Sequence, residues 1–254
     1  MNYRGKMYNR IIGMRARVLG LLLNLSGFKN IRGHWVFTNC LSAGGAVIDL
    51  GCNEGIFSKE VTALYGSHCR LVEANSDLIH AIKVPEADKF NYAISNSDGV
   101  LNFFISANSE ASSVMPHFQQ VWGQKSCVEV QCVKWKTLIK KMGFHQHQQI
   151  EILKIDIEGA ELDLIDNFDA EDIKTIVQIS AEFHDWINPS LHNRTVDSIE
   201  KLIGLGFSYY TTSPSHQWPL EIVFVNQNIV RFSLMQKIYL GLFKKLCPIS
   251  YDEN

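Results

Sequence analysis

The 254-residue sequence has few cysteines, and their arrangement indicates neither a metal site nor a disulfide framework. The six cysteines form no C-x-x-C pair, and no spacing of Cys and His residues is typical of a zinc site. Six cysteines in 254 residues are too sparse for a scaffold held by disulfides. We therefore expect reduced thiols and a cytoplasmic protein.

The sequence also lacks a basic surplus, internal repeats and a long apolar run. Its formal net charge is -2, which argues against a nucleic-acid-binding protein. The apolar run from Val18 to Leu25 follows five basic residues, as in a signal peptide, but no clear cleavage site with small residues follows it. This run is too short to span a bilayer.

Both ends of the chain combine apolar residues with basic ones. Residues 229–246 have apolar side chains at helical spacing and four Lys or Arg residues. We expect both ends to be helices packed on the main domain, although a basic amphipathic helix can also lie on an anionic membrane. The predicted division is an N-terminal helical segment (1–29), a central domain (30–228) and a C-terminal helical tail (229–254).

Between the ends, short apolar runs alternate with helical stretches. This alternation predicts an α/β domain with a mostly parallel sheet and helices on both faces. We predict antiparallel additions near residues 91–133. The predicted strands are 46–50, 70–74, 91–95, 100–106, 128–133, 151–157, 175–183, 207–212 and 220–226, and the main predicted helices are 57–65, 159–168 and 195–206.

The stretch VIDLGCNEGIFS (47–58) predicts a strand that ends in a glycine turn before a helix. Gly51 permits a tight turn and close approach of a ligand to the backbone, and Asn53 is among the few other residues that tolerate positive φ. Gly55 allows close packing at the helix start. With Asp49 at the strand end and no basic residue, the turn suits a nucleoside with a cationic group better than a pyrophosphate. An ordinary tight turn remains the alternative.

Glu73 ends the next predicted strand, 22 residues after Gly51. In Rossmann-type folds an acidic residue at about this distance accepts hydrogen bonds from the ribose hydroxyls. A surface glutamate at a strand end is the alternative. The two features together favour nucleoside binding.

The stretch LKIDIEGAELDLI (153–165) places Lys154, Asp156 and Glu158 on one side of an otherwise apolar strand. Buried charges are costly unless they are paired. Asp156 and Glu158 come at the carboxyl end of the strand, where ligands bind in doubly wound sheets. A structural network of lysine and carboxylates is the alternative, and it is compatible with a functional site.

These motifs together resemble the FkbM family of S-adenosylmethionine (SAM)-dependent methyltransferases. The resemblance rests on D-L-G-x-N-x-G, the glutamate at the next strand end, A-I-S-N-S-D-G, S-S-V, K-I-D-I-E-G-A-E and the E-x-H of AEFHDW, and it runs from Val47 to about His184. One departure is the pair Trp135-Lys136, where the family usually has Leu-Asp.

The resemblance implies a Rossmann-like seven-stranded methyltransferase fold with SAM as the cofactor. Gly51, Asn53 and Gly55 would line the methionine and ribose parts of SAM, and Glu73 would hold the ribose hydroxyls. Asp49 and Asp156 would lie near the amino group and the sulfonium. The expected cofactor-binding set is completed by Cys52, Glu54 and Ala74 beside these motifs, and by Ala93, Ile94 and Ser95 around the adenine.

Methyl transfer to an alcohol needs a base that removes the hydroxyl proton. We expect His184 in this role, oriented by Glu182, with Asp156 as the next candidate. The weaker candidates are His117, His145 and His147, and the aromatic residues that could stack on a sugar are Trp122, Trp186 and Trp218.

Metal binding is the alternative role for these residues, since Asp156, Glu182 and His184 could together bind a divalent ion. Their spacing is not diagnostic, and we expect no metal. The sequence thus predicts a SAM-dependent O-methyltransferase for a sugar hydroxyl of a glycan or glycolipid, with the acceptor pocket in loops 107–127 and 184–195. The alternatives are a methyltransferase for a small natural product or an amine, and a non-catalytic SAM-binding, membrane-associated module.

Overall fold

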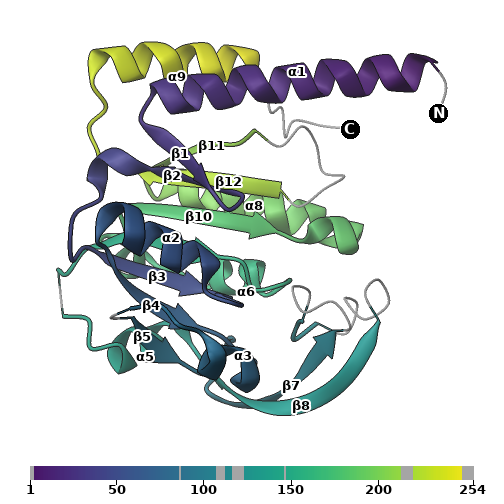
Figure 1. The fold of residues 1–254 in the computed structure, drawn as a ribbon, viewed down its shortest axis with the longest axis vertical. Coiled ribbons are helices and arrows are strands. Elements are labelled where there is room, and N and C mark those ends of the chain that lie inside the picture. Colours follow the sequence, from purple (N-terminus) through teal and green to yellow (C-terminus); the bar gives the residue numbers. More distant parts are fainter. Residues whose placement is uncertain are drawn as a thin grey trace.

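The structure is a computed structural model of the chain. It describes residues 3–85, 87–106, 112–115, 123–145, 147–212 and 220–247. A seven-stranded sheet forms the centre of the molecule (Figure 1).

The strands of the main sheet follow the order β11-β12-β10-β9-β3-β4-β5. In this sheet β12 is the strand that pairs antiparallel with its neighbours, and the other pairs are parallel. The central strand β3 is buried along its whole length, as expected for an apolar run covered on both faces. The bounds are β3 (Ala46–Leu50), β4 (His68–Val72), β5 (Asp88–Phe90), β9 (Ile150–Ile155), β10 (Gln178–Phe183), β11 (Phe207–Tyr210) and β12 (Leu220–Asn226).

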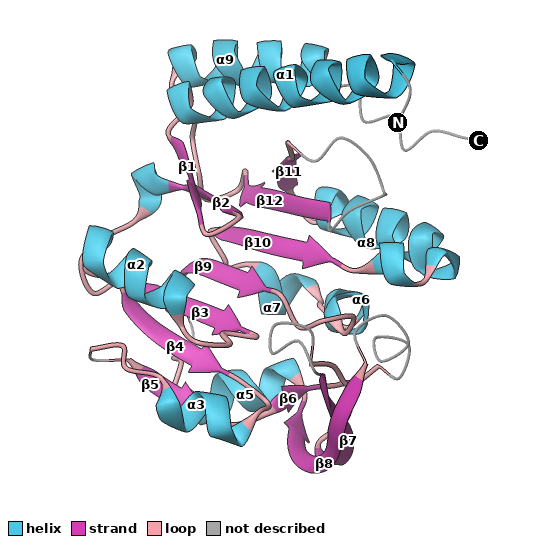
Figure 2. Cartoon of the chain, turned by 45° about the vertical axis from the view of Figure 1, so that its right-hand side comes forward, coloured by secondary structure: helices cyan, strands magenta, loops and turns pink. Residues whose placement is uncertain are grey.

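Helices cover both faces of this sheet (Figure 2). Side chains alternate along β3, so Ile48 and Leu50 join one apolar cluster and Val47 joins another. On the Val47 face lie α2 (Ile56–Tyr65) and α3 (Ser76–Ala81), and on the opposite face lie α5 (Trp135–Lys141), α6 (Glu161–Asp166), α7 (Ala170–Ile173) and α8 (His192–Gly204). The predicted fold class, a mostly parallel sheet between helices, is confirmed.

A second sheet of three strands comes from the segment expected to add antiparallel strands. It contains β6 (Ala93–Ile94), β7 (Gly99–Ser106) and β8 (Gln124–Val133) in the order β6-β8-β7. The β7–β8 pair is antiparallel as expected, whereas β6 pairs parallel with β8. The strand predicted at 91–95 is therefore shorter than expected and belongs to this second sheet.

Several short elements have no strong signal in the sequence. The hairpin of β1 (Phe28–Ile31) and β2 (His34–Phe37) and the edge strand β5 are each three or four residues long. A run this short does not complete a periodic pattern, so burial by neighbouring elements decides its conformation. Short 3₁₀ helices occupy Thr38–Cys40, Asp185–Ile187 and Pro189–Leu191.

The two ends of the chain form a pair of helices, α1 (Tyr3–Leu25) and α9 (Leu234–Leu246). The Gln236 amide donates to the carbonyl of Ser26 (3.0 Å) and Nε of Arg15 donates to the carbonyl of Leu246 (3.1 Å), so the helices run antiparallel. Their buried side chains share an apolar cluster with β1, β2 and β12. Neither α1 nor any other helix in the described ranges has the length and hydropathy needed to cross a bilayer.

Candidate active site

A cavity of about 580 Å³ lies beyond the carboxyl ends of the central strands. Its walls come from the turn after β3, the end of β4, β6 with the residue before it, and the segments after β9 and at the end of β10. Ligands of doubly wound sheets bind at this edge, because the loops there diverge and leave a crevice. The motifs singled out in the sequence meet around this cavity.

The glycine turn after β3 has the backbone conformation that its residues allow. Gly51 has φ 72° and Asn53 has φ 48°, both in the left-handed region. A Cβ on Gly51 would lie 1.7 Å from the backbone oxygen of Asp156, so glycine is required for the turn to pass the end of β9. The positive φ expected for Asn53 is confirmed.

Glu73 lies at the end of β4 and ties two loops to the cavity. Its Oε2 accepts from the backbone N–H of Asn53 (3.0 Å), and its Oε1 accepts from the backbone N–H of Asn75 (2.8 Å). Burial raises the pKa of Glu73, and these two backbone donors partly offset that effect. Each carboxylate oxygen retains a second acceptor position, which a ribose hydroxyl can use.

The expected adenine side of the cavity is largely apolar. Ala93 and Ile94 line it together with Tyr92 and Phe103. Ser95 is not among the lining residues, and its N–H donates to the carbonyl of Val133 (3.1 Å). Of the remaining expected cofactor residues, Cys52, Glu54 and Ala74 line the cavity; Gly55 does not and lies against the side chain of Ile82.

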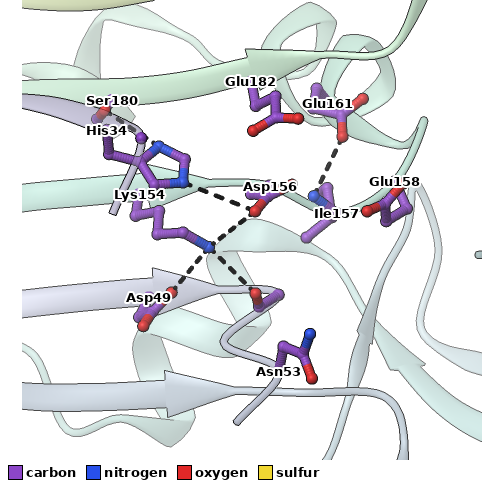
Figure 3. A network of polar contacts seen from close by, with 12 residues as sticks. His34, Asp49, Asn53, Lys154, Asp156, Ile157, Glu158, Glu161, Ser180 and Glu182 are labelled. Atoms are coloured by element: carbon purple, nitrogen blue, oxygen red, sulfur yellow. Dashed lines mark hydrogen bonds and ion pairs between the residues drawn. The ribbon is translucent and has the colours of Figure 1, made fainter. Parts of the chain in front are cut away.

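Lys154 holds a buried ionic network beneath the glycine turn (Figure 3). Its Nζ lies 3.2 Å from Asp49 Oδ1 and 3.3 Å from Asp156 Oδ2, and it donates to the carbonyl of Gly51 (3.1 Å). Burial alone would lower the pKa of Lys154, but the two carboxylates raise it above its usual value. Asp49 also accepts from the Ser58 hydroxyl (2.6 Å) and does not line the cavity. Asp49 therefore supports the turn from below.

Four carboxylates surround His184 at the open end of β10. Nδ1 of His184 donates to Oε1 of Glu161 (3.0 Å), since a carboxylate can only accept. Nε2 then faces Oε2 of Glu158 (3.3 Å), Oε1 of Glu182 (3.4 Å) and Oδ1 of Asp156 (4.0 Å). Except for Glu161, these side chains line the same cavity as the glycine turn.

The charges of this cluster shift the pKa values strongly. Burial would lower the pKa of His184, but Glu161 and Glu158 raise it well above its usual value. Burial also opposes the shift at Asp156, whose pKa Lys154 and His34 lower. The pKa of Glu158 rises to about 8, first through burial and then through the neighbouring carboxylates.

Comparison with known proteins identifies the family. The sequence profile of the methyltransferase FkbM domain matches residues 49–209, which is more than half of the chain. The chain belongs to the FkbM methyltransferase family. The matched profile is that of a methyltransferase domain, and SAM is the methyl donor that the resemblance implied. No curated protein matches the chain in a sequence search.

Solved methyltransferase structures show weak overall similarity. Methyltransferase FkbM from Methylobacillus flagellatus KT has 10% identity and a TM-score of 0.47, over 74% of this chain and 46% of its own. The precorrin-6y C5,15-methyltransferase from Geobacter metallireducens GS-15 has 10% identity and a TM-score of 0.40, over 83% and 88%. This chain thus spans about half the length of the solved FkbM structure.

Two residues of this FkbM family site had no role assigned from the sequence. Glu161 belongs to the quoted K-I-D-I-E-G-A-E run, and the structure shows that it, rather than Glu182, binds Nδ1 of His184. His34 comes from the β1–β2 hairpin, and its Nε2 lies 3.7 Å from Asp156. The run itself was a signal for Glu161, whereas nothing in the sequence links His34 to Asp156.

The other histidine and tryptophan candidates are placed as follows. Trp186 is half-buried and lines the cavity. His145 and His147 are exposed and do not line it. His117, Trp122 and Trp218 lie outside the described residues.

The family departure at Trp135-Lys136 lies away from the cavity. The Trp135 ring packs edge-on against Phe168, with centroids 5.3 Å apart, and the Lys136 ammonium pairs with Asp169 (2.7 Å). Neither residue lines the cavity. The substitution therefore changes a packed helix start and leaves the walls of the site as they are.

Proposed function

We propose that the protein transfers the methyl group of SAM to a hydroxyl of a sugar, in a glycan or a glycolipid. The observation that carries this proposal is the shared cavity, which the glycine turn, Glu73 and the His184 carboxylate cluster all line. Trp186 adds an aromatic surface beside this cluster, as expected for a site that receives a ring with apolar C–H groups.

The reaction is an in-line displacement at the methyl carbon. The acceptor oxygen forms the new C–O bond while the C–S bond breaks, and S-adenosylhomocysteine leaves as a neutral thioether. Because the sulfonium is already activated, alignment of the two partners supplies much of the rate. In this proposal the cluster of His184, Asp156 and Glu182 binds the hydroxyl, and one group of the cluster takes up its proton.

The direct test is incubation of the protein with methyl-labelled SAM and a panel of glycans and glycolipids. We expect label in a sugar methyl ether, identified by mass spectrometry after hydrolysis. Label found only in amines or in non-sugar natural products would show that the acceptor is not a sugar hydroxyl. Binding of SAM without transfer to any acceptor would favour a non-catalytic module.

We further propose that helices α1 and α9 hold the protein on an anionic membrane, where a glycolipid acceptor would lie. Figures 1 and 2 show the two helices side by side at one end of the molecule. Together they carry eight Lys or Arg residues, and all 26 Asp and Glu residues of the chain lie elsewhere. This separation of charge matches a surface that meets negative lipids.

The same helices expose an unusual share of apolar side chains. Among the described residues, nine of the 14 exposed large apolar side chains lie on α1 or α9. On α1 they fall at 14, 18, 21 and 25, a spacing that puts them on one face, opposite the buried Leu19 and Leu23. An apolar stripe flanked by basic residues is typical of helices that lie in the plane of a membrane surface.

Sedimentation with vesicles tests this surface. The full chain should bind phosphatidylserine-containing vesicles in a salt-sensitive manner, and the double variant Leu21→Asp, Leu242→Asp should bind at least about tenfold more weakly, because two apolar contacts are lost. Both side chains are exposed, so the fold should tolerate the change. The control is Val100→Asp, an exposed apolar residue on β7, which should bind as the wild type does. Equal binding of all three proteins, or none, would contradict membrane attachment.

A further inference from the structure

The His184 cluster has the composition and geometry of a divalent cation site. One ligand atom from each of Asp156, Glu158 and His184 lies within 4.8 Å of the others. Glu182 reaches the same nitrogen of His184, at 3.4 Å. In an octahedral site with bonds of roughly 2.1 Å, adjacent ligand atoms lie about 3 Å apart. The 3.3 Å and 3.4 Å distances from Nε2 to Glu158 and Glu182 are close to that spacing, and Asp156 needs a small carboxylate rotation.

His184 is oriented as metal-binding histidines are. Glu161 accepts from Nδ1–H, which leaves Nε2 directed at the three cavity carboxylates. A carboxylate on the far nitrogen fixes the ring and increases its basicity toward a metal. Glu161 is itself fixed, because it accepts from the backbone N–H groups of Ile157 and Gly159. The orientation of the ring is therefore imposed by the loop after β9.

The two carboxylate oxygens of Asp156 face different partners. Its Oδ2 faces Lys154 (3.3 Å) and His34 (3.7 Å), whereas its Oδ1 faces Nε2 of His184. One oxygen thus faces these two buried side chains, and the other faces the cavity. Figure 3 shows dashed lines from Lys154 and from His34 to Asp156.

The backbone of the loop after β9 is strained at one of these residues. Glu158 has φ 52°, a strained conformation for a residue other than glycine, and strain of this kind is concentrated at functional sites.

We propose that Asp156, Glu158, Glu182 and His184 bind one divalent cation of the Mn²⁺ class. Three carboxylates favour a hard cation, and the imidazole favours Mn²⁺ over Mg²⁺. The sequence alone led us to expect no metal, because ligand spacing along the chain does not show that these four side chains converge. In this site the ion would bind the oxygen of the acceptor hydroxyl, and this role rests on the proposed methyl transfer. The binding of the ion itself does not depend on that proposal.

Mn²⁺ binding is measured on the full chain after treatment with a chelator. Electron paramagnetic resonance reports free Mn²⁺, so its loss on titration gives the stoichiometry and affinity. We expect one Mn²⁺ per chain. Glu158→Gln and Glu182→Gln should each weaken binding by at least about tenfold, and Glu161→Gln, which only loosens the ring of His184, by about 10–100-fold. The exposed Glu129→Gln on β8 is the matched control and should bind as the wild type does.

Two further measurements distinguish loss of cation binding from loss of folding or of nucleoside binding. Circular dichroism and calorimetry with S-adenosylhomocysteine should show that the Gln variants fold and bind nucleoside normally. Absence of Mn²⁺ binding by the wild type, or equal binding by Glu158→Gln and Glu182→Gln, would overturn the metal site. Mn²⁺ binding that depends on these residues, in a protein that methylates no glycan, would support the site and count against the proposed acceptor.

Discussion

Turnover of the His184→Ala protein should fall by about 10²–10⁴-fold, the usual cost of removing a group that handles a proton in the reaction. His184 lines the cavity and lies within 4.0 Å of three carboxylates there. SAM contacts the other end of the cavity in our proposal. Its affinity should therefore change by less than about 0.5 kcal/mol, the usual scale for substitutions away from a contact. Initial rates with labelled SAM and calorimetry measure the two quantities.

His145→Ala is the matched control for this experiment, because His145 is exposed and does not line the cavity. Asp156→Asn should be measured alongside. If His184→Ala keeps its turnover while Asp156→Asn loses it, Asp156 is the base. If both keep turnover, alignment alone carries the reaction. If His184→Ala loses SAM affinity as well, His184 supports the cofactor site or the fold, and its catalytic role is wrong.

Replacing Glu73 by alanine should weaken SAM binding by about 1.5–3 kcal/mol, or roughly 10–150-fold in affinity. The lost interactions are the charge-assisted bonds to two ribose hydroxyls. The structure adds a second cause, because Glu73 also accepts the backbone N–H groups of Asn53 and Asn75. Without the carboxylate, both loops lose a fixed partner, and the glycine turn is less well ordered before SAM binds. Isothermal calorimetry gives the affinity.

Thermal unfolding separates the two contributions at Glu73. Glu73→Gln keeps one carbonyl oxygen, so it should retain one of the backbone bonds and unfold between the wild type and Glu73→Ala. Glu129→Ala, an exposed glutamate on β8, is the control and should change neither affinity nor unfolding temperature. Wild-type affinity in Glu73→Ala would remove Glu73 from the cofactor site. Failure of the unaltered protein to bind SAM would contradict the assignment of the whole cavity.

The parts of the fold that the sequence predicts well are those decided by neighbouring residues. The strand predicted at 46–50 is β3, residue for residue, and the helix predicted at 57–65 begins one residue earlier as α2. A buried apolar run, a turn that needs positive φ and an amphipathic helix each follow from local spacing. The edge strand β5 and the β1–β2 hairpin were missed, since contacts with distant segments stabilise such short strands.

By itself, the sequence determined the glycine turn and the glutamate that meet on one wall of the cavity. Gly51, Asn53 and Glu73 lie within one strand–helix–strand unit, and such a unit brings two strand ends together whatever surrounds it. Only the tertiary structure decided the chemistry of the rest of the site. It placed Glu161 on His184, put His34 of the hairpin against Asp156, and buried Asp49 beneath the turn rather than in the cavity. The charge and the role of an ionisable side chain depend on the groups within a few ångströms of it, and here those groups come from segments far apart in the chain.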